Sequence, residues 1–230
     1  MFASPGHLGW RRILKQDKML SPLQIEVARV IGEQLQGTDF ALAGGAALIS
    51  EGVVNRFTND LDFFGTSSDS VPLLTEKVTT ALTQHGFDVI INNEKTFNQF
   101  TRMTVRRENA STEVDLGVDY RLFPTVQGKY SPVLSIAELA VNKVLAVFGR
   151  AAPRDFVDLY FSIRIYALKD LLDMAKQKDL GFDLLMFSQS LDRMKFLQRD
   201  QFEVDDETYE FMVEATLNWK IQLEQWIDEK

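Results

Sequence analysis

The sequence feature that most constrains the fold is a pair of aspartates, Asp60 and Asp62, set among the apolar residues Leu61, Phe63 and Phe64. Burying an unpaired carboxylate costs on the order of several kcal/mol, so both side chains need water or a cationic partner. Alternate residues of a β-strand share one face, which separates the two carboxylates from Leu61 and Phe63. The segment therefore predicts a strand that displays two carboxylates while its opposite face packs into a core.

The glycines upstream, Gly44 and Gly45, give this strand a context. The apolar stretch 40–43 predicts a buried strand that the glycines end, and a short helix is expected over 46–51. Free backbone N–H groups at the start of a helix can hold phosphate. Two neighbouring carboxylates repel unless a cation lies between them, and Mg²⁺ prefers carboxylate oxygens. A solvated face is the plain alternative for an isolated Asp-x-Asp, but the combined pattern favours a phosphate and metal site.

A third carboxylate would complete such a metal site, and Asp115 is the candidate. It lies in a predicted β-hairpin formed by residues 98–107 and 111–118. Glu113 and Asp119 share its strand face if the strand runs unbroken, because side chains alternate along a strand. Asp115 is preferred because it lies more centrally among apolar neighbours.

A second group of charged residues follows one predicted helix and opens the next. Lys143 and Arg150, seven residues apart, share a helical face, and Arg154, Asp155 and Asp158 begin the following helix. Taken alone, Lys143 is more often an exposed helix charge. Acidic residues in a first turn are ordinary partners of the helix dipole, and Asp158 can pair with Arg154 at a spacing of four. A functional assignment therefore needs a further argument.

The order of elements predicts an α+β protein with two parts. Residues 1–130 are expected to form a mixed sheet with flanking helices, and residues 131–230 a helical domain that completes a cleft. Capping residues, periodicity and turn signals define the boundaries. Helices are expected from Pro22 to Gly37 and over 46–51, 70–84, 136–148, from Pro153, 168–176, 182–194 and 206–227; strands over 40–43, 59–64, 87–92 and the hairpin around turn 108–110; and a loop over 120–131.

Composition excludes several classes of function. With no cysteine, the chain has no disulfide, thiol nucleophile or thiolate metal site, and the isolated His7 and His85 do not support a histidine site. No apolar run is long enough for a transmembrane helix and no signal peptide is evident, so a cytoplasmic protein without membrane contact is expected. The net charge of -8 gives no bulk attraction to nucleic acid. Two local basic clusters could still contact a phosphate backbone or simply be solvated: Arg102, Arg106 and Arg107, and Arg11, Arg12, Lys15 and Lys18.

The segments LAGGAAL and NRFTNDLDFF resemble the signature of polymerase-β-type nucleotidyltransferases. Within that superfamily the sequence is similar to the AbiEii/AbiGii-type abortive-infection toxins, which carry two glycines and then an Arg-x-Thr-x-Asp-x-Asp segment. A second block in the same order, a helical lysine, an arginine and a basic-Asp-x-x-Asp segment, also matches. The matching residues are Gly44, Gly45, Ala47, Leu48, Arg56, Thr58, Asp60, Leu61, Asp62, Phe63, Lys143, Arg150, Arg154, Asp155 and Asp158.

This resemblance implies a metal-dependent enzyme that transfers a nucleotide from an NTP to an acceptor. It implies Mg²⁺ or Mn²⁺ as cofactor and an AbiEi-type antitoxin encoded nearby. The acceptor implied by some relatives is the 3′ end of tRNA; a small molecule of the aminoglycoside type, a protein, or a non-catalytic nucleotide-binding module are the alternatives. The strand pattern and the resemblance together predict metal binding by Asp60, Asp62 and Asp115; nucleotide binding by Gly44, Gly45, Arg56, Thr58 and Lys143; and a catalytic contribution from these aspartates, from Lys143 and from Asp155 or Asp158.

Overall fold

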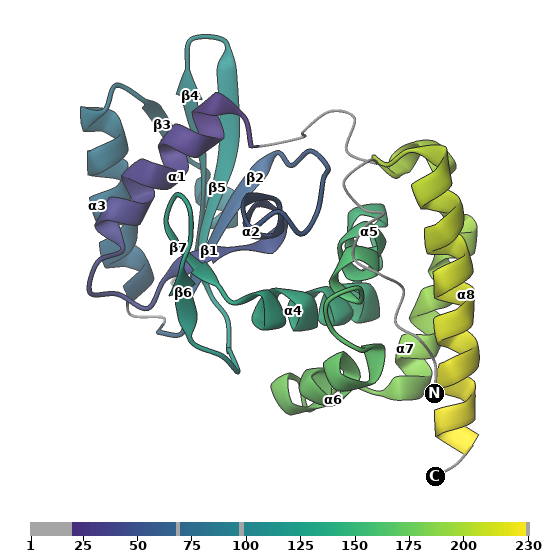
Figure 1. Cartoon of the computed structure of the whole chain (residues 1–230). Helices are drawn as coiled ribbons and strands as arrows, with labels where there is room; N and C mark the ends of the chain where they lie inside the picture. Colours follow the sequence, from purple (N-terminus) through teal and green to yellow (C-terminus); the bar gives the residue numbers. More distant parts are fainter. Residues whose placement is uncertain (1–19, 68–69, 97–98, 229–230) are drawn as a thin grey trace.

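The computed structural model of the chain describes residues 20–67, 70–96 and 99–228 (Figure 1). The basic cluster at residues 11–18 and the isolated His7 lie outside the described residues. Among the described residues, none of the helices combines the length and apolar character that crossing a membrane requires.

The first part of the chain alternates helices and strands. Its helices are α1 (Pro22–Gln34), α2 (Gly44–Ser50), α3 (Ser70–Gln84) and the short 3₁₀ helix η2 (Asn93–Lys95). Its strands are β1 (Ala41–Ala43), β2 (Asp60–Gly65), β3 (Asp88–Ile91), β4 (Phe100–Arg107), β5 (Ala110–Val118), β6 (Thr125–Gln127) and β7 (Pro132–Leu134). The second part is helical: α4 (Ile136–Gly149), α5 (Pro153–Ser162), α6 (Leu168–Lys178), α7 (Leu184–Leu191), η3 (Asp192–Phe196), η4 (Arg199–Gln201) and α8 (Asp206–Asp228).

The strands form one mixed sheet in the order β3-β4-β5-β2-β1-β7-β6. Strand β2 runs parallel to β5, with Asp62 beside Asp115, and antiparallel to β1. The β4–β5 hairpin turns at Glu108, whose backbone is left-handed with φ of 54°. The central strand β2 thus lies between β5, which carries the candidate third carboxylate, and β1, which leads into Gly44.

One face of the sheet is apolar and covered. Leu61 and Phe63 of β2 are fully buried, as are Val114 of β5 and Met103 of β4. Helix α3 contacts β3, β4 and β5, and α1 packs on α3 and β5, so these two helices cover that face (Figure 1). Alternation along the strands leaves the carboxylates on the opposite face. The core thereby fixes which way Asp60 and Asp62 point, because a one-residue slip would expose Leu61 and Phe63.

The helical part is joined to the sheet through α2 and α4. Ser135 caps α4 through a hydrogen bond from the Glu138 N–H at 3.3 Å. Helix α4 contacts α2, α5, α6 and α7, and α8 packs on α7 and α5 (Figure 1). At the end of α6, Lys178 Nζ lies 2.6 Å from Glu138 Oε1 and 2.8 Å from Asp119 Oδ2, which ties α6 to α4 and to the end of β5.

The α+β class, the mixed sheet and the helical second part agree with expectation. The expected loop over 120–131 is wrong in part, because β6 forms inside it and pairs with β7. Strand β7 in turn pairs with β1, so the expected division between residues 130 and 131 falls inside the β6–β7 hairpin of the sheet. Helix α2 begins at Gly44 itself, not after the two glycines.

Candidate active site

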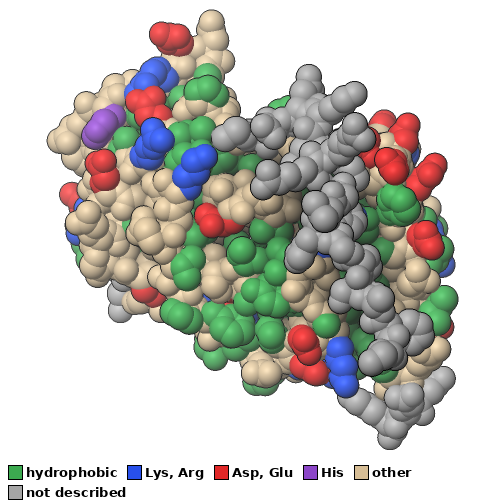
Figure 2. Space-filling model, in the orientation of Figure 1, with side chains coloured by type: hydrophobic (Ala, Val, Ile, Leu, Met, Phe, Trp, Pro, Cys, Tyr) green, Lys and Arg blue, Asp and Glu red, His purple; other side chains and the backbone are tan. Residues whose placement is uncertain are grey.

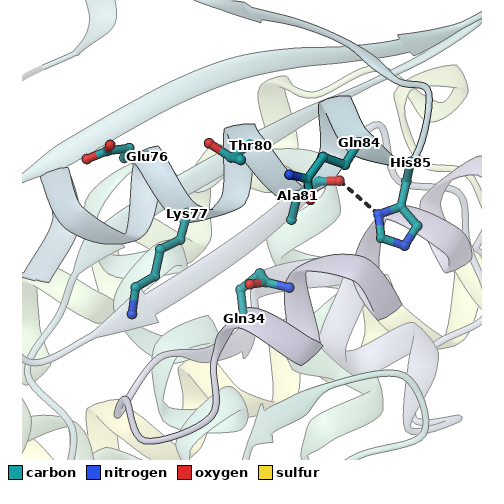
Figure 3. A pocket seen from close by; sticks show the side chains of 7 residues that line it. All are labelled: Gln34, Glu76, Lys77, Thr80, Ala81, Gln84 and His85. Atoms are coloured by element: carbon teal, nitrogen blue, oxygen red, sulfur yellow. Dashed lines mark hydrogen bonds between the residues drawn. The ribbon is translucent and has the colours of Figure 1, made fainter.

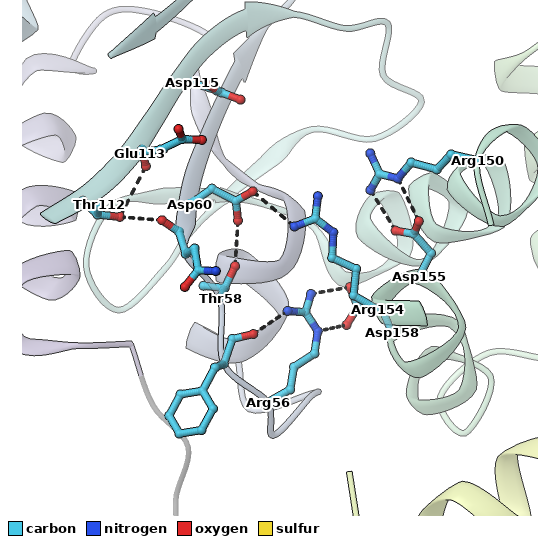
Figure 4. A network of polar contacts seen from close by, with 12 residues as sticks. Arg56, Thr58, Asp60, Thr112, Glu113, Asp115, Arg150, Arg154, Asp155 and Asp158 are labelled. Carbon is cyan, nitrogen blue, oxygen red and sulfur yellow. Dashed lines mark hydrogen bonds and ion pairs between the residues drawn. The ribbon is translucent and has the colours of Figure 1, made fainter. Parts of the chain in front are cut away.

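The carboxylates of Asp60, Asp62 and Asp115 lie on the open face of the sheet. The parallel register of β2 and β5 places Asp60 beside Glu113 and Asp62 beside Asp115. Thr58 Oγ1 donates to Asp60 Oδ1 at 2.7 Å, which orients that carboxylate (Figure 4). The structure therefore brings together the three aspartates that the sequence singled out, and we refer to Asp60, Asp62, Glu113 and Asp115 as the carboxylate row.

Gly44 lies directly against the Asp62 carboxylate. Its backbone is left-handed, with φ of 63°, and a Cβ placed there would lie 1.9 Å from Asp62 Oδ2. A Cβ on Gly45 would lie 2.3 Å from Arg56 Nη2. Both glycines are thus required by close packing of site side chains, and Gly44 also by its backbone conformation.

The environment of Asp62 disfavours its charged form. Desolvation by burial raises its pKa from 3.8 to about 6, and the negative charges of Asp60 and Asp115 act in the same direction. The positive charges of Lys143 and Arg154 offset part of this rise. A cation bound beside Asp62 would relieve the repulsion, because an opposite charge favours the ionised carboxylate.

Asp115 is held by an arginine from the neighbouring strand. Arg102 of β4 stands opposite Asp115, and its Nε donates to Asp115 Oδ1 at 2.7 Å while Nη2 donates to Oδ2. The Asp115 side chain is 5% exposed. Both carboxylate oxygens therefore already accept a charge-assisted hydrogen bond, which is the stronger class of hydrogen bond in proteins.

A buried cluster of opposite charges connects α5 to the loop before β2. Arg56 Nε and Nη2 donate to the two oxygens of Asp158, each at 2.7 Å, and Arg56 Nη1 donates to the Phe57 carbonyl at 2.6 Å (Figure 4). Lys143 Nζ from α4 lies 2.8 Å from Asp158 Oδ2. Burial raises the pKa of Asp158, but Lys143 and Arg56 together bring it below its ordinary value. Asp158 is therefore an ionised carboxylate that orients both cations.

Asp155 has a different set of partners. Arg150 donates to both of its oxygens at 2.8 Å, and the Ala152 N–H donates to Oδ2 at 3.2 Å. Lys143 Nζ lies 3.8 Å from Asp155 Oδ1, farther than from Asp158. The hydrogen bond to Asp155 raises the pKa of Arg150, against the effect of desolvation. Asp155 thus caps α5 and anchors Arg150, while Asp158 is the direct partner of Lys143.

Arg154 is the cation of α5 that faces the carboxylate row. Its Nη1 donates to Asp60 Oδ2 at 3.4 Å, and its side chain is 48% exposed (Figure 4). Asp158 does not make the intrahelical pair with Arg154 that the sequence suggested, since it contacts Arg56 and Lys143. The row is thereby flanked by Arg154 on one side and by Arg102 on the other.

The oxygen ligands of the carboxylate row fit a hard divalent cation such as Mg²⁺ or Mn²⁺. The strand register supports this fit, because it places Asp62 beside Asp115 on the face that also carries Asp60. The pKa of Asp62 is raised mainly by desolvation, and the negative charges of Asp60 and Asp115 add to that rise. Among the described residues, no group of three or more acidic or histidine side chains is arranged as a metal cluster. Asp62 fits as a ligand, and so does Asp60, although Arg154 lies 3.4 Å from its Oδ2. Asp115 fits only after a rearrangement of Arg102, which binds both of its oxygens.

A surface pocket lies away from this site. A pocket of about 310 Å³ lies between α1 and α3, on the covered side of the sheet, and His85 Nδ1 there donates to the Ala81 carbonyl at 2.8 Å (Figure 3). It is lined by Gln34, Glu76, Lys77, Thr80, Ala81, Gln84 and His85. On the face shown in Figure 2, the coloured Lys and Arg side chains are interspersed with Asp and Glu.

The hairpin arginines have separate environments. Arg107 donates to Glu26 Oε2 at 2.7 Å and lies 3.8 Å from the centre of the Phe87 ring, so it holds the hairpin to α1. Arg102 is bound to Asp115, and Arg106 is exposed. Sequence reasoning grouped these three as a cluster and missed the pairing of Arg102 with Asp115, which a correct hairpin register would have revealed. It also missed the contact between Arg154 and Asp60, for which the sequence carries no signal.

Comparison with known proteins decides the family. The family model of the nucleotidyl transferase AbiEii toxin, from type IV toxin–antitoxin systems, matches residues 27–222. The chain belongs to the AbiEii family. It is therefore a nucleotidyltransferase, as the sequence predicted. The family description implies a nucleotide substrate and a cognate antitoxin.

Solved structures share the fold of this AbiEii-family chain. JHP933 from Helicobacter pylori is 22% identical, with a TM-score of 0.55, and the likeness covers 91% of this chain and 97% of that one. MenT4, the nucleotidyltransferase toxin Rv2826c from Mycobacterium tuberculosis H37Rv, is 16% identical, with a TM-score of 0.51, covering 89% and 85%. No curated protein matched the sequence. At these identities the structural likeness concerns the fold alone.

Proposed function

We propose that this AbiEii-family enzyme transfers a nucleoside monophosphate from an NTP to the 3′ end of tRNA, with Mg²⁺ or Mn²⁺ as cofactor. The observation that carries the metal-dependent step is the carboxylate row, with Asp62 packed against Gly44 and its pKa raised to about 6. The tRNA acceptor rests on the resemblance to family members that modify tRNA.

In the proposed reaction, a hydroxyl oxygen of the acceptor forms a bond to the α-phosphorus of the NTP. The bond from that phosphorus to the bridging oxygen breaks, pyrophosphate leaves, and Asp115 takes the hydroxyl proton. A cation bound to Asp60 and Asp62 would neutralise phosphate charge, which is the main requirement of phosphoryl transfer. Asp115 is proposed both to complete the cation site and to act as the base, because it belongs to the same row. It can take either role only when Arg102 releases its oxygens.

The positive side chains opposite the row are proposed to orient the triphosphate. Lys143 is nearly buried and held by Asp158 at 2.8 Å, so its charge is fixed in direction. Fixed charges need no reorganisation during the reaction, which makes them effective in stabilising developing negative charge. Arg154, half exposed, is the side chain of this group most able to follow a bound nucleotide. Arg56 keeps its predicted contribution to nucleotide binding in this proposal, through its hold on Asp158.

Labelled transfer tests the proposed function. The full chain is incubated with each α-labelled NTP, Mg²⁺ or Mn²⁺, and one of total tRNA, periodate-oxidised tRNA or an aminoglycoside. We expect label in intact tRNA and none in oxidised tRNA, which lacks the free 3′-hydroxyl. EDTA or Asp60→Ala should abolish labelling. Asp88→Ala, which changes an exposed aspartate on edge strand β3, is the matched control and should keep it.

The other outcomes separate the alternatives. Label in the aminoglycoside alone, or in the polypeptide itself, would replace tRNA with a small-molecule or protein acceptor and keep the metal-dependent transfer. Absence of label from every acceptor would overturn the catalytic proposal.

We also propose that the chain is the toxin of a pair with an AbiEi-type antitoxin. Growth arrest on expression should be relieved by Asp62→Ala, by Lys143→Ala, or by co-expression of the adjacent antitoxin gene. Arrest that persists in both variants would contradict a toxicity based on nucleotidyl transfer.

A further inference from the structure

The carboxylate row ends in a cation that the proposed reaction does not use. Asp62 on β2, Asp115 on β5 and Arg102 on β4 are consecutive cross-strand neighbours. Besides its two hydrogen bonds to Asp115, Arg102 places Nη1 3.6 Å from Glu113 Oε2. The Arg102 side chain is 26% exposed, so its guanidinium reaches the open face of the sheet.

Arg102 supplies the countercharge of Asp115. A guanidinium bound to both oxygens of a carboxylate combines charge with a fixed geometry, and it does not lose its proton at physiological pH. Hydrogen bonding to Asp115 raises the pKa of Arg102 against the effect of desolvation, and the charges of Glu113 and Asp62 contribute. Arg102 therefore neutralises the same negative charge that a divalent cation would.

A cation and a guanidinium on one carboxylate are close like charges. Inside a protein their repulsion far exceeds its value in water, because the effective dielectric constant is lower. Asp115 is 5% exposed, which leaves little solvent to screen the two positive charges. Simultaneous occupation of Asp115 by both groups is therefore unfavourable.

We propose that Arg102 is a displaceable countercharge of Asp115, so that the Arg102–Asp115 pair and a divalent cation bound by Asp115 exclude one another. The proposal rests on the metal-dependent function proposed above. Its consequence is that Arg102 lowers the affinity of the carboxylate row for its cation. Arg102 is in this sense a positioning residue that acts through Asp115.

The opposite role makes an opposite prediction. A carboxylate has about four lone-pair sites, so Asp115 could in principle bind a cation while Arg102 stays and orients it. Loss of such an orienting partner weakens metal binding by about 10–100-fold. Loss of a competing countercharge strengthens it. The sign of the change in metal affinity therefore separates the two roles.

Direct titration with Mn²⁺ measures this sign without relying on activity. Free Mn²⁺ is followed by electron paramagnetic resonance in solutions of the full chain. We expect Arg102→Gln to bind Mn²⁺ about tenfold tighter than the unaltered chain, which corresponds to about 1.4 kcal/mol. Arg106→Gln, an exposed arginine four residues along the same strand, should bind like the unaltered chain. Asp60→Ala should bind more weakly, which identifies the site.

The outcomes distinguish this proposal from the metal-dependent function. Unchanged or weaker binding in Arg102→Gln, with binding by the unaltered chain intact, would overturn the countercharge role and leave the metal site standing. Failure of both proteins to bind Mn²⁺ would overturn the two together. Binding by Arg102→Gln alone would support the exclusion. If Arg102→Gln does not fold, Arg102→Lys keeps the charge but not the paired hydrogen bonds, and should bind about threefold tighter.

Discussion

Arg56→Met tests whether the buried pair of Arg56 with Asp158 holds the two parts of the chain together. Arg56 is 4% exposed and Asp158 is fully buried, with two hydrogen bonds of 2.7 Å between them. Removing one partner of a buried pair costs about 3–5 kcal/mol, because the remaining charge is left uncompensated. Lys143, at 2.8 Å, still compensates Asp158, so we expect the lower end, about 3 kcal/mol.

This loss is large enough to measure in two ways. It corresponds to about a 150-fold change in the folding equilibrium, since each 1.4 kcal/mol is about tenfold. For a chain of this length, about 2–4 °C of melting temperature is lost per kcal/mol, which gives a fall of about 6–12 °C. Urea unfolding at pH 7.5, followed by circular dichroism and by tryptophan fluorescence, to which the buried Trp219 contributes, provides the free energy of unfolding.

The control is Lys195→Met, which breaks the exposed pair with Asp192 and should cost no more than about 1 kcal/mol. If Arg56→Met lowers the free energy of unfolding as little as this control does, the Arg56–Asp158 pair does not hold the two parts together. Unchanged stability together with lost nucleotide binding would instead assign Arg56 to direct contact with the nucleotide.

The stabilisation by this pair should depend on pH. Because the pKa of the folded-state Asp158 lies below the ordinary value of 3.8, the contribution of its charge to stability is complete above pH 3.8 and is lost as pH falls through the lowered pKa. At acid pH, the free energies of unfolding of Arg56→Met and of the unaltered chain should therefore differ less than at neutral pH.

Three further predictions concern a glycine and two buried charges. Gly44→Ala should abolish Mn²⁺ binding and nucleotidyl transfer, because the new Cβ would lie 1.9 Å from Asp62 Oδ2. The control is Gly37→Ala, where φ is 76° and a Cβ would meet no atom of the described residues within 4 Å. This control should lose only about 1 kcal/mol of stability and should keep both Mn²⁺ binding and transfer. Asp62→Asn should raise the free energy of unfolding by up to about 3 kcal/mol at pH 8 and by little at pH 3. The reason is that the raised pKa of Asp62 destabilises the folded chain progressively as pH rises from 3.8 to about 6. Equal effects in urea titrations at both pH values would contradict this. Lys178→Met should lower the melting temperature by about 6–12 °C, because the buried Glu138 loses its cation and keeps, among the described residues, only the Leu122 and Phe123 N–H groups as donors. The added change Glu138→Gln should recover part of this loss, and no recovery in a thermal melt would show that the ion pair is not the cause.

Local sequence rules predicted an element correctly where the residues that determine it lie within one short segment. The alternation of apolar residues and aspartates in β2 defined both its faces, and the structure buries Leu61 and Phe63. The Ser21–Pro22 start of α1 was equally clear, because the Ser21 side chain accepts from the Gln24 N–H and the Gln24 side chain accepts from the Ser21 N–H. In each case the deciding interactions lie within one turn or one strand.

The hairpin shows how a small error in a turn hides a site contact. The turn was expected over three residues, 108–110, which would place Arg102 opposite Leu116. The structure pairs Arg107 with Ala110, a two-residue turn, and therefore Arg102 with Asp115. Neither Glu108 nor Asn109 is followed by a glycine that would mark the turn type, although Glu108 adopts a left-handed backbone. A shift of one residue changes every cross-strand pair, so the bond between Arg102 and Asp115 was not visible in the sequence.

Contacts between distant segments were the least predictable. Strand β6 is three residues long and is fixed only by pairing with β7, so the segment reads locally as a loop. Arg56 and Asp158 stand in recognisable motifs, but no periodicity relates two residues that far apart. Their pairing depends on how α5 packs beside the loop before β2, which is tertiary information.

A ribosome completes Arg56 well before Asp158, because 102 positions separate them. At about 5–20 residues per second, synthesis of the intervening segment lasts about 5–20 s. For most of that interval, until residue 143 is added, the nascent chain carries Asp60 and Asp62 but has neither Lys143 nor the α5 carboxylates. A truncated product that ends before α4 would likewise lack the cations opposite the carboxylate row. The complete set of site residues is therefore present only after most of the polypeptide has been made, and we expect a chain interrupted before α4 to be inactive.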